Sequence, residues 1–262
     1  METKDYLANF YEDYDEDGRL LTKYGMVEYS TTMKYVEKYL QPGMRVLEVG
    51  AATGRYSHAL AQKGYHVDAV ELLEHNIEIF KQNTTPGETV TVTQGNAMDL
   101  SMFEDDTYDI TLLLGPMYHL FTKEDKLRAL SEAIRVTKKN GIIIAAYCMG
   151  DANILSYGFV RGAIYDIIEK CMLDTETFDT FSNPWDIFEL YRKEDIDNLR
   201  SEFDVTQLHF VAADGYTNHI RERITNMDDR MYELYVKYHL AICERTDMVG
   251  YSHHTLDIFR KN

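Results

Sequence analysis

The sequence predicts a doubly wound α/β fold, in which helices cover both faces of a mainly parallel sheet. Aliphatic runs alternate with amphipathic stretches between residues 45 and 150, a pattern typical of βαβ units. Runs such as ITLLLG (110–115) and IIIAAY (142–147) contain few polar residues, as expected for strands buried on both faces. The 262 residues, of which 45% are hydrophobic and 27% charged, suffice for a sizeable core.

The order of the elements follows from the same patterning. Apolar residues at helical spacing predict a helix over 26–40, which QPG ends. We expect strands at 44–49, 66–72, 89–95, 108–115, 142–148, 204–212 and 254–261. We expect intervening helices at 56–63, 74–83 and 123–137, a turn at 138–141, and helical stretches over 151–203 and 216–245.

This order divides the chain into four parts. Residues 1–40 form an N-terminal helical lid, and 41–150 form the nucleotide-binding core. Residues 151–203 form a helical insertion that caps the substrate, and 204–262 return to the core as strands with helices between them. We expect the late helical stretches to stack over one edge of the sheet.

The charge and the cysteines restrict the function. A net charge of −17 disfavours a nucleic-acid substrate and favours a neutral or cationic small molecule, although acidity also serves solubility. Three scattered cysteines without metal-ligand spacing predict a reducing, cytoplasmic location. We expect no signal peptide, because the first 20 residues are acidic, and no membrane span, because no apolar run is long enough.

The stretch VLEVGAATG (46–54) predicts a nucleotide-binding turn between a strand and a helix. It lacks the Lys of a P-loop, and its glycines do not have the G-x-G-x-x-G spacing of dinucleotide sites. The carboxylate of Glu48 would repel a pyrophosphate but attract an ammonium group. The residues therefore favour a nucleotide that carries an amino-acid tail.

Two later strand ends complete the expected site. Glu71 stands at the end of the second strand, about 20 residues after the glycine turn, a position suited to accept hydrogen bonds from both ribose hydroxyls. Asn96 offers an amide to the amine of an adenine, and Ala97 and Met98 offer an apolar wall to its ring.

These motifs, in this order, resemble the class I S-adenosylmethionine (SAM)-dependent methyltransferases. LEVGAATG is similar to the E/D-x-G-x-G-x-G motif, GNAMDL to G-D-A-x-x-L, and the stretch ending RVTKKNG to R-V-L-K-P-G-G. The resemblance covers about 45–148 and the two terminal strands. It implies a Rossmann-like, seven-stranded mixed sheet with the last strand antiparallel, SAM as cofactor and S-adenosylhomocysteine as product. Two residues depart from the pattern: Ala52 replaces a glycine, and Asn96 replaces an aspartate.

The resemblance also implies which residues bind the cofactor. The backbone around Gly50 and Glu48 would hold the methionine end, Glu71 the ribose, and Asn96 with its neighbours the adenine. The N-terminal segment supplies Tyr14 and Arg19 as further candidates. The full expected set is Glu48, Gly50, Ala51, Ala52, Gly54, Glu71, Leu72, Asn96, Ala97, Met98, Leu114, Tyr14 and Arg19.

The acceptor is expected beyond the fourth strand, at LLLGPMYHLF (112–121). This stretch lacks the N/D-P-P-Y/F signature of enzymes that methylate amide or adenine nitrogens. His119 is a candidate general base and Tyr118 a candidate to orient the nucleophile, whereas the alternative is that His119 braces the next helix. No metal-ligand spacing is evident. His253 and His254 are interpreted as loop residues.

The sequence thus predicts methyl transfer from SAM to an O or N atom of a small molecule. Aromatic residues in the insertions would form the acceptor walls or simply pack the helices. Two other functions stay open. One is an RNA or protein methyltransferase, and the other is a non-catalytic SAM-binding protein.

Overall fold

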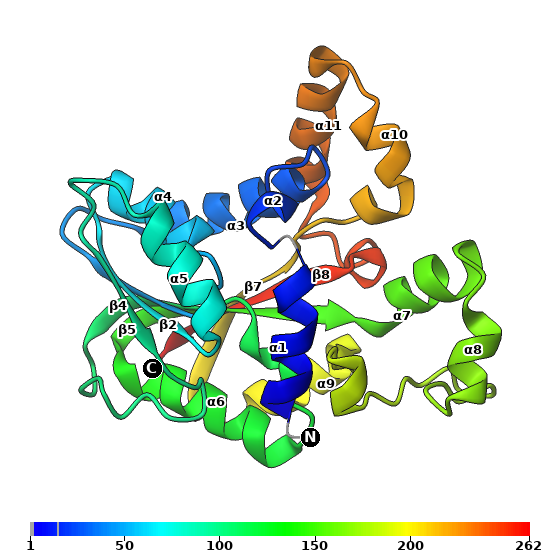
Figure 1. Cartoon of the computed structure of the whole chain (residues 1–262), viewed down its shortest axis with the longest axis horizontal. Coiled ribbons are helices and arrows are strands. Elements are labelled where there is room, and N and C mark those ends of the chain that lie inside the picture. Colours follow the sequence, from blue (N-terminus) through cyan, green and yellow to red (C-terminus); the bar gives the residue numbers. More distant parts are fainter. Residues whose placement is uncertain (1–2, 15) are drawn as a thin grey trace.

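The computed structural model describes residues 3–14 and 16–262. These residues form one eight-stranded mixed sheet in the order β3-β2-β1-β4-β5-β8-β7, with the short β6 pairing to the end of β5 (Figure 1). The strands are β1 Arg45–Val49, β2 His66–Glu71, β3 Val90–Gln94, β4 Tyr108–Leu113, β5 Thr137–Met149, β6 Leu190–Tyr191, β7 Val205–Ala212 and β8 His254–Lys261. The last strand, β8, runs antiparallel to both of its neighbours, which confirms the predicted fold class.

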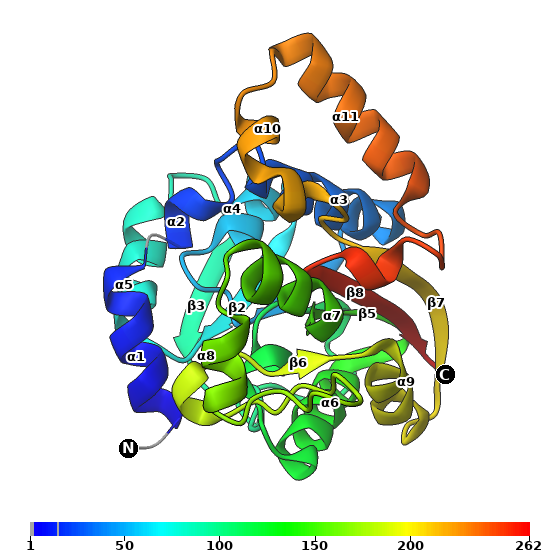
Figure 2. The same cartoon turned by 90° about the vertical axis from the view of Figure 1, so that its right-hand side faces the viewer.

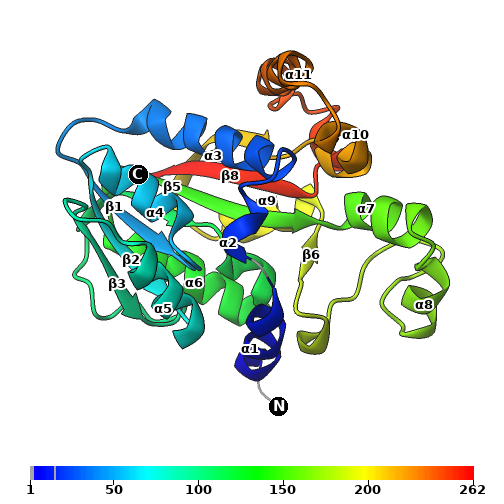
Figure 3. The ribbon, with the colours of Figure 1, turned by 45° about the horizontal axis from the view of Figure 1, so that its top comes forward.

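Helices cover both faces of this sheet, as Figure 3 shows for α3 and α6. One apolar core joins α3 and α4 to one face, and a second core joins α6 and α9 to the other. The longer helices are α1 Thr3–Asp13, α3 Gly25–Tyr39, α4 Arg55–Gln62, α5 Glu74–Asn83, α6 Lys123–Val136, α9 Lys193–Ser201 and α11 Asp229–Ile242. Short helices lie at α2 Glu16–Arg19, α7 Gly150–Asn153, α8 Ile164–Glu169 and α10 Arg221–Thr225.

The predicted turn at 138–141 is wrong, because these residues belong to β5. The strand starts at Thr137 and contains an irregularity where the pairing moves from Tyr108–Thr137 to Ile110–Ile142. Asn140 has a φ of 64°, so the strand bulges there instead of turning. Pairing of Thr137 and Ile142 with β4, on either side of KKNG, has therefore overridden the local turn chemistry of these four residues.

The insertion 151–203 is less helical than predicted. α7 leads into a π-helical turn at Ile154–Val160 and then α8, but residues 170–183 are irregular, and β6 lies within the stretch that we expected to be helical. Pro184 explains part of this difference, since proline disfavours a helical conformation in the residue before it, and Asn183 is extended. The segment that remains helical is α9.

The C-terminal helical stretch is present but divides into α10 and α11, with Asp228 capping α11 through its side chain. Figure 2 shows these two helices standing away from the body of the molecule, above α3. α11 lies against α3, where Lys34 Nζ donates to the Leu240 carbonyl at 3.0 Å. In the described part of the chain, no helix is both long and apolar enough to cross a membrane.

Candidate active site

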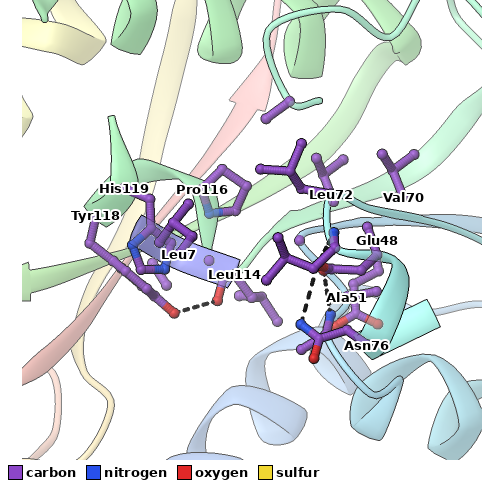
Figure 4. Close-up of a pocket in the computed structure, with 18 of the residues that line it drawn as sticks. Leu7, Glu48, Ala51, Val70, Leu72, Asn76, Leu114, Pro116, Tyr118 and His119 are labelled. Atoms are coloured by element: carbon purple, nitrogen blue, oxygen red, sulfur yellow. Dashed lines mark hydrogen bonds between the residues drawn. The ribbon is translucent and has the colours of Figure 1, made fainter. Parts of the chain in front are cut away.

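The carboxyl ends of β1, β2 and β4 meet around a cavity of about 420 Å³. Most of the expected cofactor residues line it, and Figure 4 shows Glu48 and Leu72 on one side of it and Tyr118 and His119 on the other. The lining includes Glu48, Gly50, Ala51, Ala52, Glu71, Leu72, Asn96, Ala97, Met98, Leu114 and Arg19. Residues along α1, among them Leu7 and Tyr11, close one side of the cavity.

Two of the expected cofactor residues do not line this cavity. Gly54 begins α4, where an added Cβ would lie 2.5 Å from the Phe80 ring and 2.7 Å from His58 Nε2. Its role in the structure is to let helix α4 approach α5. Tyr14 lines a different, larger cavity and stacks on Phe10 with 5.0 Å between ring centroids.

The glycine turn is anchored to the second strand. The N–H groups of Gly50 and Ala51 donate to the carbonyl of Val70, at 2.8 and 3.1 Å. Gly50 has a φ of 77°, and a Cβ there would lie 2.6 Å from Pro116. Ala52 has a φ of 47°, a conformation that favours glycine, so the departure from the motif is a strained residue.

Glu71 holds this strained turn in place. Its Oε2 accepts from the Ala52 N–H at 2.9 Å, and its Oε1 accepts from the Leu73 N–H at 2.9 Å and from Asn76 Nδ2 at 3.2 Å. A carboxylate oxygen accepts two hydrogen bonds, so Oε2 has capacity for one more donor on the cavity side. Burial raises the pKa of Glu71, and the three donors partly oppose that rise.

Glu48 is a buried acid. Its side chain is 1% exposed and accepts a short hydrogen bond from the Ser57 hydroxyl. Burial raises the pKa of Glu48 to about 8, and the neighbouring Glu71 carboxylate adds to the rise. A cationic group bound in this cavity would stabilise the ionised form of Glu48.

Asn96 lies where β3 ends. Its Oδ1 accepts from the Met98 N–H at 3.0 Å, which shapes the turn that carries Ala97 and Met98 along the cavity wall. The amide oxygen has a second lone pair, so an adenine amine can still be accepted there.

His119 and Tyr118 lie on a 3₁₀ turn after β4. His119 Nδ1 donates to the Ile187 carbonyl at 2.7 Å, and Nε2 faces the Tyr11 hydroxyl at 3.1 Å. Burial lowers the pKa of His119 to about 4, so the ring is neutral at neutral pH. The Tyr118 hydroxyl donates to the Leu114 carbonyl at 2.9 Å. These contacts join His119 to the insertion and to α1 and not to the next helix, α6. A bracing role for His119 and a catalytic role for either residue both stay predictions.

A second cavity of about 910 Å³ lies beside the first. Among the described residues, five line both cavities: Tyr11, Arg19, Glu28, Tyr118 and His254. Aromatic side chains from the N-terminal segment and the insertion surround the larger cavity, namely Tyr6, Phe10, Tyr14, Tyr24, Tyr157, Phe181, Trp185 and Phe188. The two cavities therefore meet at a polar border, and the second one has aromatic walls.

The border contains a charged cluster that the sequence did not reveal. His254 Nδ1 lies 2.7 Å from Asp214 Oδ2 and 3.5 Å from Glu28 Oε2, and Arg19 pairs with both oxygens of Glu28 at 2.7 and 3.2 Å. His254 was interpreted as a loop residue, but it begins β8. Because β8 is antiparallel, its first residue lies at the carboxyl end of β5, opposite Cys148. The position of His254 at the start of an antiparallel last strand could therefore have indicated that it lies near the cavity.

Glu28, Asp214 and His254 bring donor atoms within 4.8 Å of one another, which is also a spacing compatible with a metal ion. Two contacts favour a hydrogen-bonded cluster instead. The imidazole N–H already faces Asp214, and Arg19 already neutralises Glu28. We therefore interpret the cluster as an acid–base group.

Comparison with known proteins agrees with this geometry. Residues 46–141 match the family model described as a methyltransferase domain. A demethylmenaquinone methyltransferase of Clavibacter sepedonicus is 33% identical over 103 residues, which are 39% of this chain and 40% of the relative. A glycine/sarcosine N-methyltransferase of Aphanothece halophytica is 25% identical over 53% of this chain and 52% of the relative. The chain spans about half the length, or less, of the curated relatives it matches.

Among solved structures, the CcbJ methyltransferase of Streptomyces caelestis superposes with a TM-score of 0.62 at 14% identity, covering 100% of this chain and 99% of the other. At that identity the likeness concerns the fold. Together with the matched domain, these findings define a class I methyltransferase fold around a nucleotide cavity.

Residues 46–141 are a methyltransferase domain, and its motifs and fold are those of the class I SAM-dependent methyltransferases, whose cofactor is SAM. The residues of the smaller cavity fit that cofactor. A buried acid at Glu48 suits the ammonium and sulfonium charges, and Glu71 Oε2 has capacity for a ribose hydroxyl.

Proposed function

We propose that this protein transfers a methyl group from SAM to an O or N atom of a small-molecule acceptor. The observation that carries the proposal is the junction of two cavities at one polar border. The smaller cavity is suited to the cofactor, and the larger one, of about 910 Å³, is suited to a small molecule. When bound, the cofactor supplies an activated methyl group, and the protein's task is to align an acceptor with it.

The cofactor side of the proposal depends on three groups. Glu48 would hold the ammonium group, Glu71 the ribose, and Asn96 the adenine. The turn from Gly50 to Ala52 would bring backbone close to the methionine end of the ligand. Each of these roles extends the contacts described above to a bound cofactor.

The acceptor side depends on the aromatic walls of the larger cavity. Flat rings such as Trp185 and Tyr157 favour planar ligands by stacking and by apolar burial. Tyr118 lines both cavities and so would contact an acceptor close to the methyl group. A small-molecule acceptor fits this chamber better than a polymer does.

The two alternative functions find less support. The net charge of −17 opposes an RNA substrate. A non-catalytic SAM-binding protein would have a closed acceptor side without polar groups near the methyl, whereas Arg19, Glu28 and His254 line the border between the cavities.

Calorimetric titration with SAM and with S-adenosylhomocysteine tests the cofactor assignment. We expect wild-type binding that Glu71→Gln weakens about 10–100-fold, since a hydrogen bond to a charged group contributes about 1.5–3 kcal/mol. Glu74→Gln is the matched control, because this exposed acid lies in the next helix and lines neither cavity.

Methyl transfer is then measured with isotope-labelled SAM against a panel of phenols and amines. Failure of the folded wild-type protein to bind either SAM or S-adenosylhomocysteine would refute the proposal. Cofactor binding without methylation of any small molecule would favour the non-catalytic alternative.

A further inference from the structure

We infer that His254, oriented by Asp214, is the general base that takes the proton from an aromatic hydroxyl of the acceptor. The inference rests on the proposed function and makes it more specific, since it selects O over N and names the group that removes the proton. It also assigns a role to a histidine outside the region matched by the family model, which ends at residue 141.

The position of His254 suits such a base. Its ring lines both cavities, so it lies at the border where an acceptor atom would meet the methyl group. Nδ1 donates to Asp214 Oδ2 at 2.7 Å, which fixes the orientation of the ring. Nε2, on the opposite side of the ring, has no hydrogen bond to any residue that the structure describes, and it is not among the buried unpartnered atoms.

Asp214 is itself held rigidly. Its side chain is 1% exposed and accepts hydrogen bonds from the Ser252 hydroxyl, the His253 and His254 N–H groups and Asn218 Nδ2. Despite burial, its histidine and hydroxyl neighbours hold the pKa of Asp214 below its usual range. An ionised carboxylate fixed behind an imidazole orients a base and stabilises the imidazolium that forms.

The groups around His254 make it a stronger base than an ordinary histidine. Glu28 from α3, Cys148 from β5 and Asp214 all raise the pKa of His254 well above 6.5, against the effect of burial. Arg19 pairs with both oxygens of Glu28 on the same side of the cluster. The Tyr118 ring lies 6.4 Å away, centroid to centroid.

A base of raised basicity matches a weakly acidic nucleophile, because proton transfer is most efficient when the two groups have similar pKa values. Phenolic hydroxyls are such nucleophiles, and the aromatic walls of the larger cavity suit the ring that carries them. In the step, the acceptor O–H bond breaks and its proton moves to Nε2 of neutral His254. The oxygen lone pair forms the bond to the methyl carbon, while the carbon–sulfur bond breaks and leaves its electron pair on sulfur.

The pH dependence of the reaction follows from this step. The base must be neutral, so kcat rises with pH through the pKa of His254, above pH 6.5. Glu28→Gln removes one negative neighbour, which lowers the pKa of His254 and moves the rise in kcat to lower pH. Asp214→Asn acts in the same direction if the variant folds. If His254 had only a structural role, these substitutions would not shift the pH dependence of kcat.

The first test needs no acceptor. Nuclear magnetic resonance of ring-labelled histidines gives the pKa and tautomer of His254 in the wild type and in Glu28→Gln. We expect a raised pKa with the proton on Nδ1 in the neutral form, and a lower pKa in Glu28→Gln. The control is His66→Gln, which should leave the pKa of His254 unchanged. His66 is exposed and begins β2, at the end of that strand away from the cavity. A His254 pKa near or below 6.5, or one that ignores Glu28→Gln, would overturn the inference.

The second test uses 4-nitrophenol, whose ionised form absorbs visible light, with S-adenosylhomocysteine present. We expect the wild type to bind it with its proton transferred, and His254→Gln to bind it unionised. In methyl transfer to a phenol, His254→Gln should lower kcat about 10²–10⁴-fold while affinity for S-adenosylhomocysteine changes little. Retained ionisation or retained kcat in His254→Gln would contradict the inference, as would a pH profile that moves in His119→Gln.

The outcomes also separate this inference from the proposed function. If the folded wild-type protein does not bind SAM, the methyltransferase proposal is refuted. Normal SAM binding with methylation of amines but not phenols refutes only the inference about His254.

Discussion

The two cavities are built in different ways. The smaller one is made mainly from turns that directly follow β1, β2, β3 and β4, and most of its polar groups lie within 46–141. The larger one is made from α1, the insertion after β5, and short stretches around Asn218 and His254. Only the first can be read from neighbouring residues in the sequence.

The two cavities differ because one is formed by local strand ends and the other by contacts between distant segments. The cofactor cavity reuses the edge of the sheet, where the strand ends place Glu48 and Glu71 together whatever the rest of the chain does. The acceptor cavity depends on contacts between segments far apart, such as Asp214 and His254, which are forty residues apart. We therefore expect substitutions in one cavity to leave the other largely unaffected.

The largest expected effect is on the glycine turn. Gly54→Ala places a Cβ 2.5 Å from Phe80 at a φ of 88°, so we expect a loss of about 3 kcal/mol or more in the free energy of unfolding. Gly43→Ala is the matched control, because Gly43 has a φ of 84° but open space around it, so only about 1 kcal/mol is lost. Urea unfolding measures both. Equal losses would show that crowding at α4 is not what requires Gly54.

The next effect concerns the buried acid of the cofactor cavity. Because burial raises the pKa of Glu48 to about 8, folding favours its protonated form, and the unfavourable contribution to stability grows as pH rises from about 4.5 towards 8. A cofactor ammonium would lower this pKa, so SAM binding near pH 6.5 should release close to one proton. Calorimetry in buffers of different ionisation enthalpy measures that number.

Glu48→Gln should abolish the proton release and weaken SAM binding about tenfold. Glu74→Gln, exposed on α5, should change neither quantity. Proton release that persists in Glu48→Gln would place the titrating group elsewhere in the cavity.

The smallest effect is expected at the aromatic wall. Trp185 is 45% exposed and lines the larger cavity, so Trp185→Ala should weaken 4-nitrophenol binding about 3–10-fold through lost stacking, about 1 kcal/mol. Binding of S-adenosylhomocysteine should stay unchanged. Phe159→Ala is the control, since this ring is 54% exposed in the same insertion but lines neither cavity. A loss of cofactor affinity in Trp185→Ala would mean that the cavities are coupled.

Much of the fold followed from local patterning. Seven of the strands were predicted close to their observed positions, because uninterrupted aliphatic runs are hard to place anywhere but in a buried sheet. The residues 138–141 were predicted wrongly because pairing with β4 and β8 converts a turn sequence into a bulge. The insertion was overestimated as helix because its aromatic residues line a cavity and do not form a regular apolar stripe.

The candidate site divides in the same way. Glu48, Glu71 and Asn96 line one cavity, as the sequence predicted, because each lies at the carboxyl end of a strand or directly after it. His254 and Asp214 were missed because neither has a neighbour in sequence that marks it, and their meeting depends on the antiparallel direction of β8.

The hydrogen bond between His254 and Asp214 has a consequence for residues 215–253, which lie between them. α10 and α11 lie between these two residues, and the Ala213 N–H also donates to the His254 carbonyl at 2.9 Å, so the excursion begins and ends at one point of the sheet. The entropy of closing such a loop grows only slowly with its length. Insertions in the exposed turns of this arm therefore cost little loop-closure entropy, whereas buried contacts such as that of His239 Nε2 with Thr31 Oγ1 at 3.0 Å fix where α11 lies against α3.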